Sequence, residues 1–175
     1  MERTVKLFSL DAETNGLHGQ AFAVAAVVTD DNGVEVAQFA ARCPITGPVD
    51  GWVQANVLPA IADMPQTHGS YEAMCDAFHD FYLTHRAGAD VIAHIAWPVE
   101  ARLLSDVFAQ PDRQWDGPFP LLDVASILYA HGFDPSTVDG YNAAHGVTVP
   151  FDGPAHHPLY DAWAAERCTR YLLTA

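Results

Sequence analysis

Two acidic residues near the start of the chain have the spacing of a metal site. Asp11 and Glu13 flank Ala12, and residues two apart in a β-strand point to the same face, so their carboxylates would lie together. Such a pair is costly unless it is protonated or neutralised by a cation, and hard divalent cations such as Mg²⁺ prefer oxygen ligands. The pattern therefore indicates a divalent-metal site, with an ordinary acidic strand end before the Asn15-Gly16 turn as the structural alternative.

A second segment combines histidines with an acid at the start of a predicted helix. His156 and His157 lie in a loop directly before this helix, and Asp161 lies in its first turn. An imidazole with an ordinary pKa near 6.5 can accept a proton at neutral pH, and Asp161 could hold a metal beside it. The structural alternative is that Asp161 complements the positive helix N-terminus and that His157 caps the helix.

Two further acids follow predicted strands. Glu100 lies in the first turn of a helix that is predicted after the strand ending at His94, and Asp123 lies at the end of a short strand. Acids in the first turn of a helix are common because they complement its dipole. Glu100 is therefore a candidate only in combination with the other acids, and we predict a structural role for Asp123.

The elements that must position these residues form an α/β pattern. We predict strands at residues 4–10, 22–29, 34–42, 90–94 and 121–123, and helices at residues 52–61, 71–85, 98–109, 124–131, 136–145 and 158–173. The turn residues of segment 11–16 follow the first strand, and segment 30–33 (Asp-Asp-Asn-Gly) predicts a hairpin turn between the next two. Strands followed by alternating helices and strands predict a mixed sheet flanked by helices, with an antiparallel first hairpin.

In this order, the segments resemble the motifs of the DEDDh (DnaQ-like) 3′–5′ exonucleases, a family of the ribonuclease H-like superfamily. Residues 11–17 (Asp-Ala-Glu-Thr-Asn-Gly-Leu) resemble the first motif at the end of the first strand. His156, five residues before Asp161, resembles the third motif. The resemblance covers nearly the whole chain and implies a ribonuclease H-like fold with a mixed five-stranded sheet, formed by one exonuclease domain over residues 1–175.

The second motif of the family departs from its usual form here. His94 ends the strand, Ile95 stands where the family often has asparagine, and Glu100 stands where it usually has aspartate, with Leu103-Leu104 behind it. The chain therefore resembles a DEEDh-type variant. A register shifted by one residue puts Val99 at the acidic position and would indicate an inactive site.

The resemblance implies two divalent metal ions, Mg²⁺ or Mn²⁺, as cofactors. Asp11 would bridge both ions, Glu13 and Asp161 would complete one site, and Glu100 would contribute directly or through water. His156 would be the general base. These five residues would catalyse phosphodiester hydrolysis that releases nucleoside monophosphates.

The same resemblance implies how the substrate binds. Residues Thr14, Asn15, Gly16 and Leu17 would hold the 3′-terminal nucleotide, with Leu17 packing on its base or sugar, and His94 would lie along the path of the strand. The expected partners are single-stranded DNA or RNA 3′ ends. A homodimer or a recruiting protein partner stays open.

The charge balance bears on the substrate. Eight basic residues, of which only Lys6 is a lysine, face 22 acidic ones and give a formal net charge of −14. Such a surface repels long polyanions, so a protein that coats duplex DNA is excluded, whereas chemistry at a nucleic-acid end is not, because bound cations invert the local field. We therefore expect short or frayed single strands as substrates and a shallow dependence of activity on salt.

The spacing of the cysteines and the hydropathy of the sequence indicate the cellular compartment. The three cysteines are far apart and form no CxxC pair, so neither a disulfide framework nor a thiolate zinc site is expected. No apolar run approaches the roughly 20 residues needed to cross a bilayer, and no signal peptide is evident. We therefore expect a cytoplasmic protein that does not enter membranes.

Two other functions are compatible with the sequence. A catalytically impaired exonuclease-fold module that binds or regulates would explain Glu100, Ile95 and the acidic surface. An acidic mimic of DNA would need rows of charge but no assembled metal site.

Overall fold

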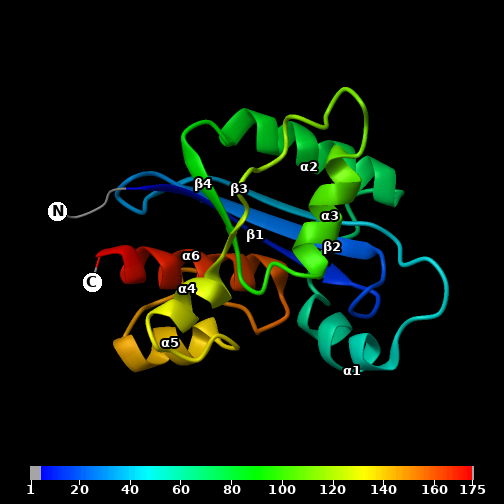
Figure 1. Cartoon of the computed structure of the whole chain (residues 1–175). Coiled ribbons are helices and arrows are strands. Elements are labelled where there is room, and N and C mark those ends of the chain that lie inside the picture. Colours follow the sequence, from blue (N-terminus) through cyan, green and yellow to red (C-terminus); the bar gives the residue numbers. More distant parts are fainter. Residues whose placement is uncertain (1–4, 175) are drawn as a thin grey trace.

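The computed structural model describes residues 5–174 and contains one five-stranded sheet (Figure 1). The strands are β1 (Lys6–Thr14), β2 (Ala21–Thr29), β3 (Glu35–Arg42), β4 (Ala89–Ala93) and β5 (Leu122–Asp123). Their order across the sheet is β3-β2-β1-β4-β5. β1, β2 and β3 pair antiparallel, whereas β4 and β5 run parallel to β1. The predicted mixed sheet and its antiparallel hairpin are confirmed.

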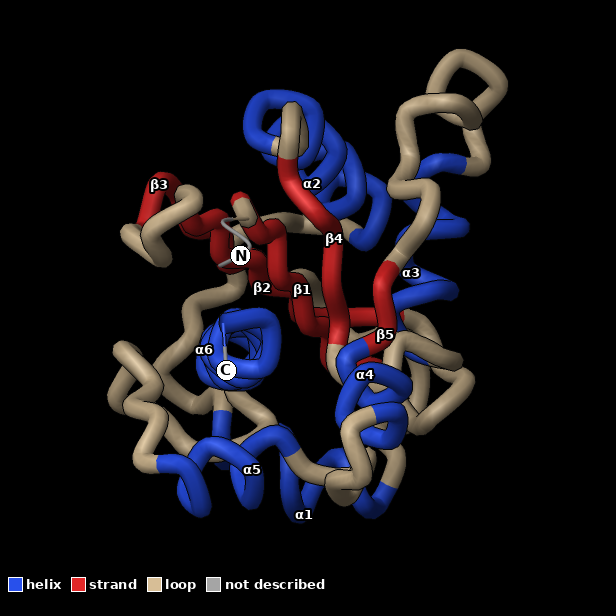
Figure 2. The backbone as a smooth tube through the Cα atoms, turned by 60° about the vertical axis from the view of Figure 1, so that its left-hand side comes forward, coloured by secondary structure: helices blue, strands red, loops and turns tan. Residues whose placement is uncertain are grey.

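Helices cover both faces of this sheet (Figure 2). They are α1 (Gly51–Ala60), α2 (Tyr71–His85), α3 (Val99–Phe108), α4 (Val124–Ala130), α5 (Val138–His145) and α6 (Pro158–Thr174). Buried residues of α1, α2 and α3 share one core with β1 and β2. Those of α4, α5 and α6 share the core on the other face. Within residues 5–174, no helix is long and apolar enough to cross a lipid bilayer.

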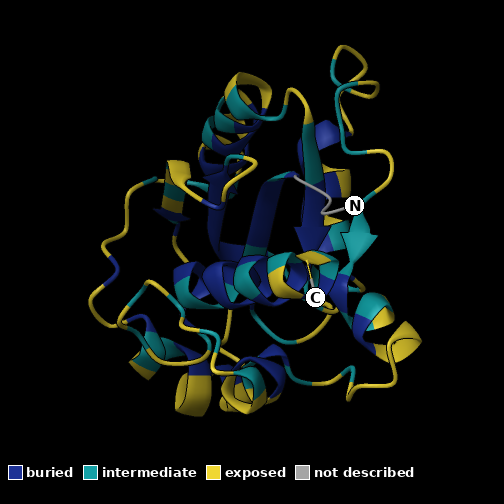
Figure 3. Cartoon of the chain, turned by 90° about the vertical axis from the view of Figure 1, so that its left-hand side faces the viewer, coloured by how far each residue is buried: buried dark blue, intermediate teal, exposed yellow. Residues whose placement is uncertain are grey.

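The two-residue period of β1 decides which side chains face which core. Phe8 and Leu10 pack with α2 and α3, whereas Leu7 packs with α6. The Ser9 hydroxyl, on the same face as Leu7, donates a 2.7 Å hydrogen bond to the carbonyl of Ala162. By the same period Asp11 lies on the α6 face, so β1 brings its acids to the start of α6. β1 and β2 in the middle of the sheet are buried almost throughout, whereas β3 at its edge is largely exposed or half-buried. Figure 3 shows many of the exposed residues in loops and on outer helix faces.

The first strand is longer than the sequence indicates. We predicted that it ends at Leu10 and that a turn follows, but β1 continues to Thr14 because Asp11 and Glu13 pair with Ala25 and Ala23 of β2. Cross-strand pairing outweighs the local turn preference of these residues. The predicted residue Thr4 lies outside the described residues. The other boundaries agree with the predictions to within about three residues, which is the usual difference at element ends.

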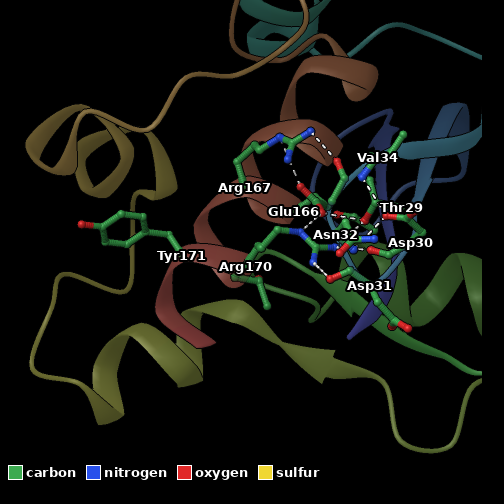
Figure 4. A network of polar contacts seen from close by, with 12 residues as sticks. Thr29, Asp30, Asp31, Asn32, Val34, Glu166, Arg167, Arg170 and Tyr171 are labelled. Atoms are coloured by element: carbon green, nitrogen blue, oxygen red, sulfur yellow. Dashed lines mark hydrogen bonds and ion pairs between the residues drawn. The ribbon is translucent and has the colours of Figure 1, made fainter. Parts of the chain in front are cut away.

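A buried ion-pair network fixes α6 against the β2–β3 hairpin (Figure 4). Glu166 is fully buried, and its Oε1 accepts hydrogen bonds from the Thr29 hydroxyl at 2.6 Å and from Nε of Arg170 at 2.8 Å. Arg170 also donates to the carbonyl of Asp30 in the hairpin turn at 3.0 Å. Together with the Ser9 hydrogen bond to Ala162, the network holds both halves of α6 and so fixes its first turn beside β1.

Candidate active site

The carboxyl ends of three parallel strands and the starts of two helices meet at one edge of the sheet. β1 supplies Asp11 and Glu13, the first turn of α3 supplies Glu100, and the first turn of α6 supplies Asp161. All four acids line one cleft of about 340 Å³. The cleft is also lined by side chains that follow β4 and that begin α5: His94, Ile95, Trp97, Ser136, Thr137 and Asp139.

The turn before α6 brings His156 to the acids. The backbone N–H of His156 donates to Oδ2 of Asp161 at 2.9 Å, and this contact accounts for the five-residue spacing of the pair. His156 adopts a left-handed backbone with φ of 68°. Ligand atoms of Glu13, His156 and Asp161 all lie within 4.8 Å of one another. Asp161 therefore has two roles: it closes the turn before α6 through the N–H of His156, and it lies close to Glu13.

Glu100 lies with the other acids. Its side chain is 3% exposed, and its Oε1 accepts a 3.2 Å hydrogen bond from the backbone N–H of Ala12, between Asp11 and Glu13. Val99 also lines the cleft, but it offers only apolar atoms. Of these two neighbouring residues, Glu100 therefore brings a carboxylate to Asp11 and Glu13, and Val99 brings none.

Burial and the charges of neighbouring acids raise the pKa values of the four carboxyl groups. Loss of solvent, followed by the charges of Asp161 and Glu100, raises the pKa of Glu13 to about 9 and that of Asp11 well above its usual range. Burial likewise raises the pKa of Glu100 to about 8 and that of Asp161 to about 7. Desolvation and like charges both disfavour ionised carboxylates, so this group is costly in its ionised form without a cation.

Several observations fit divalent cations at this position. Oδ2 of Asp11 is buried and has no hydrogen-bond donor among the described residues. Carboxylate oxygens are the donors that Mg²⁺ and Mn²⁺ prefer. Among residues 5–174, no lysine or arginine lines the cleft that could neutralise the acids instead. The residues present therefore suit hard divalent ions.

His157 differs from its neighbour. It is buried, its Nδ1 accepts a 3.3 Å hydrogen bond from the backbone N–H of Leu159, and its ring packs 4.9 Å from that of Phe151. Burial lowers the pKa of its imidazole. His157 caps α6, as the structural alternative for this residue predicted, and its Nε2 lies 4.0 Å from Oδ1 of Asp63.

Two residues at the ends of parallel strands β4 and β5 have structural contacts. Asp123 accepts hydrogen bonds from the backbone N–H of Ala96 at 3.1 Å and from that of Ser126 at 2.9 Å, which agrees with the structural role predicted for it. His94 lines the cleft, and its Nε2 lies 3.0 Å from the carbonyl oxygen of Pro135. This contact holds the His94 ring against the wall of the cleft.

The loop after β1 contributes to two hollows. Leu17 is 64% exposed and lines both the acidic cleft and a neighbouring hollow of about 370 Å³ that Thr14 and Gly16 also line. The side chain of Asn15 instead makes two hydrogen bonds to the segment before α1. Its Nδ2 donates to the carbonyl of Pro48 at 2.9 Å, and its Oδ1 accepts from the N–H of Asp50 at 2.8 Å. Asn15 thereby fixes the start of α1 beside the cleft.

Sequence reasoning did not find three residues of this region. Trp52 of α1 contacts the His156 ring edge-to-face, with centroids 5.1 Å apart and planes at 82°. Asp139 of α5 lines the cleft, accepts a 3.0 Å hydrogen bond from the Tyr160 hydroxyl and raises the pKa of Asp161. Trp97 lies on the rim. Of these three residues, only Asp139 could have been suspected from the sequence, because it lies in the first turn of a predicted helix.

Neither protein-family models nor curated proteins give a match to this chain. Solved structures do match. A structure of exonuclease I superposes with a TM-score of 0.66 at 13% identity over 93% of this chain and 39% of that chain. E. coli exonuclease I in complex with a dT13 oligonucleotide gives 0.56 at 13% identity over 95% and 40%. The chain has the ribonuclease H-like fold of exonuclease I.

The likeness to exonuclease I concerns the fold. E. coli exonuclease I with a dA16 oligonucleotide gives a TM-score of 0.53, and a complex of ExoI with SSB-Ct gives 0.52, both at 13% identity. This chain spans about two fifths of the length of these exonuclease I structures, since it covers 39–41% of them. The predicted fold class, a mixed five-stranded sheet of the ribonuclease H-like type, is confirmed.

Proposed function

We propose that this chain is a metal-dependent 3′–5′ exonuclease that releases nucleoside monophosphates from the 3′ ends of short or single-stranded nucleic acid. The observation that carries the proposal is the convergence of Asp11, Glu13, Glu100 and Asp161 with His156 at the edge where the parallel strands end. The fold likeness to exonuclease I, which was solved with single-stranded oligonucleotides, supports the same reading. In this proposal, the acids and His156 form a DEEDh-type pattern.

The metal ligands in this proposal are the four acids. Asp11, Glu13 and Asp161 would hold the ions, and Glu100 would contribute directly or through water. Two bound divalent ions, Mg²⁺ or Mn²⁺, would stabilise the charge on the phosphoryl oxygens and on the leaving oxygen and would make water more acidic. The unmatched Oδ2 of Asp11 and the raised pKa values of all four carboxyl groups support this ligand set.

His156 is the general base of the proposed reaction. Its ring lies beside Glu13 and Asp161, so it can accept the proton of the water that attacks the terminal phosphodiester. The P–O bond to the 3′ oxygen of the preceding nucleotide then breaks. The products are a nucleoside 5′-monophosphate and a strand with a new 3′ hydroxyl. Thr14 to Leu17 would hold the terminal nucleotide, and His94, which lines the cleft, would lie along the path of the strand.

A cleavage assay with two labels tests the proposal. Single-stranded DNA and RNA carrying a 5′ or a 3′ label are incubated with Mg²⁺ or Mn²⁺, and products are resolved at single-nucleotide steps. We expect 3′-labelled monophosphate first and a ladder of shortened 5′-labelled strands, and no cleavage with a chelator.

Asp11→Asn is the matched control for this assay because it removes charge and keeps the shape. Removing a metal ligand should lower the cleavage rate by more than the about 10- to 100-fold that is typical when a residue contacting such a ligand is changed. A variant as fast as the wild type in saturating Mg²⁺ contradicts the assigned metal site.

The second candidate is an exonuclease-fold module that binds without turnover. The observation favouring it is Glu100 in place of the family's aspartate, with apolar Val99 beside it in the cleft. Calorimetry separates the two functions when it is combined with the cleavage assay. Saturable Mn²⁺ binding without cleavage of either nucleic acid supports the binding module. Diffuse binding without a defined stoichiometry supports neither and favours an acidic mimic of DNA.

A further inference from the structure

The two edges of the sheet differ in how they are protected (Figure 2). β5 at one edge has only two residues and follows a loop that contains Pro118 and Pro120. β3 at the other edge has eight residues, and its segment 36–41 (Val-Ala-Gln-Phe-Ala-Ala) contains no charged residue, proline or glycine. Short length, prolines and charges are the usual features that keep an edge strand from pairing with another chain. Segment 36–41 has none of them.

The backbone of β3 shows which groups this edge presents. The N–H of Arg42 donates to Oγ1 of Thr67 at 3.0 Å, and the carbonyl of Arg42 accepts from the N–H of Thr67 at 2.9 Å. The backbone groups of Arg42 therefore point away from β2. Because this direction alternates along a strand, the N–H and carbonyl groups of Gln38 and Ala40 point outward as well. Among residues 5–174, the backbone pairing of segment 36–41 is the ladder with β2 alone.

The side chains at this edge form a neutral and largely apolar strip. Val36 is 53% exposed, and Gln38 and Ala40 are exposed with it. Gln38 and Ala40 lie opposite Val27 and Ala25 of β2, which pack against α6. The helix thus covers β2 on this face and leaves β3 uncovered. On a chain with a net charge of −14, such a strip is a place where a second strongly acidic chain can approach.

We propose that β3 pairs antiparallel with β3 of a second copy of this chain, with Gln38 opposite Gln38, so that two five-stranded sheets become one. Gln38 is the midpoint of residues 35–41, the stretch that ends where Thr67 covers Arg42. In this register the two Gln38 residues exchange backbone hydrogen bonds through their outward groups. The inference concerns assembly and does not rest on the proposed function.

The sequence of β3 is complementary to itself in this register, as a two-fold symmetric interface requires. On the face of α6, Val36 of one copy lies opposite Ala40 of the other. On the face of α2, Phe39 lies opposite Ala37. Each larger side chain therefore meets a small one, which lets the strands approach without a clash, and cross-strand pairs of this kind stabilise a sheet.

The charges at the two ends of β3 favour the same arrangement. Glu35 begins the strand and Arg42 ends it. Antiparallel pairing brings Glu35 of each copy to the end of the other strand, where Arg42 lies. Opposite charges across a strand pair are stabilising, so this acidic residue at the edge finds a basic one in the second copy.

The oligomeric state of the full chain tests the proposal. Sedimentation equilibrium over about 10 to 500 µM should give a mass that rises from the 19.0 kDa of one chain toward twice that value. Gln38→Pro removes the outward N–H from both copies and leaves the ladder to β2, since edge strands accept proline where the N–H faces solvent. Loss of two hydrogen bonds should weaken the dimer by about 5- to 150-fold. Gln38→Thr keeps the N–H and is the matched control.

A charge exchange tests the register. Because Gln38 lies opposite itself, Gln38→Lys and Gln38→Glu each place two like charges in contact, and each variant alone should be monomeric. An equimolar mixture should form a mixed dimer, because the introduced lysine then lies opposite the introduced glutamate. Thermal unfolding confirms that each variant is folded.

Three results would overturn the proposal. One is a wild type that stays monomeric at about 500 µM, and another is a dimer that Gln38→Pro leaves unchanged. The third is a pair of monomeric charge variants that do not associate when mixed. Gln38 does not line the acidic cleft, so each of these results is independent of whether the chain cleaves nucleic acid.

Discussion

Glu100 reaches the acidic group with one methylene more than an aspartate would have. That methylene corresponds to roughly 1.5 Å of reach, and the observed hydrogen bond from Ala12 uses it. Val99, which the alternative register puts at the acidic position, lines the same cleft but has no carboxylate. The role of Glu100 therefore depends on the length of its side chain, which substitutions at this position can test.

We expect Glu100→Asp to keep or raise the Mg²⁺-supported cleavage rate, because the shorter carboxylate can act through a water molecule. Glu100→Ala should lower the rate by at least about 10-fold, since it removes an oxygen donor from the site. Val99→Ala is the matched control and should keep the metal dependence of the wild type. Initial rates over a Mg²⁺ titration measure all three. Unchanged rates in both Glu100 variants would show that Glu100 is not the acid of the second motif.

The two adjacent histidines should separate into a catalytic and a structural residue. His156→Ala should lose about 10²- to 10⁴-fold in kcat, as expected for a general base, and should unfold near the wild-type temperature. His157→Ala should instead lose about 1–2 kcal/mol of stability, because it removes the cap of α6, and its folded fraction should stay active. Single-turnover rates and thermal unfolding provide the two readouts. The reverse pattern would assign the base to His157.

At the scale of elements, α1 connects the loop after β1 to the proposed base. Asn15 holds the first residues of α1 through Pro48 and Asp50, and Trp52 in the first turn contacts the His156 ring. His156 itself sits in a loop, which alone would leave its ring free to rotate. The helix therefore supplies the rigid surface against which the ring is oriented.

We expect Trp52→Ala to lower kcat by about 10- to 100-fold with a smaller change in KM, because small displacements of a reacting group cost this much. Trp52→Phe keeps an aromatic ring and should recover most of the rate. Gln54→Ala on the same helix is exposed and is the control. Steady-state kinetics across pH 5–9 measure the effect, since a misplaced base also alters the pH profile of kcat. A change confined to KM would instead identify Trp52 as a substrate contact.

At the scale of the whole molecule, the acidic group makes stability depend on pH and metal. Its carboxyl groups have raised pKa values in the folded chain, about 9 for Glu13, 8 for Glu100 and 7 for Asp161. In the unfolded chain they titrate near their ordinary values of about 4. As pH rises above about 4, the unfolded chain loses these protons first, so the folded state is progressively disfavoured until the folded pKa values are passed.

We therefore expect the melting temperature of the metal-free protein to fall between about pH 5 and pH 9. Mn²⁺ should raise it most at the alkaline end, because the ion binds the ionised carboxylates of the folded state. Scanning calorimetry in chelator and in Mn²⁺ measures both curves, and Asp11→Asn should show a shallower fall. A flat curve in chelator, or no stabilisation by Mn²⁺ at pH 8, contradicts the acidic group as described.

Local patterns in the sequence determined the elements and part of the site. Once residues 11–14 continue the strand, its two-residue period puts Asp11 and Glu13 on one face, and the turn before a helix is enough to bring His156 to Asp161. The apolar run of β2 and the Asp-Asp-Asn-Gly turn after it predicted the hairpin for the same reason. These relations depend only on backbone geometry over a few residues, so they can be predicted from the local sequence.

Only the tertiary structure decided the relations between distant segments. Pairing with β2 extends β1 through its acids, packing of α3 turns Glu100 rather than Val99 toward them, and the approach of α1 puts Trp52 against His156. The raised pKa values of the four carboxyl groups follow from the same packing. Each of these depends on which residues come within a few ångströms across separations of about 10 to 150 residues, and no local pattern encodes that proximity.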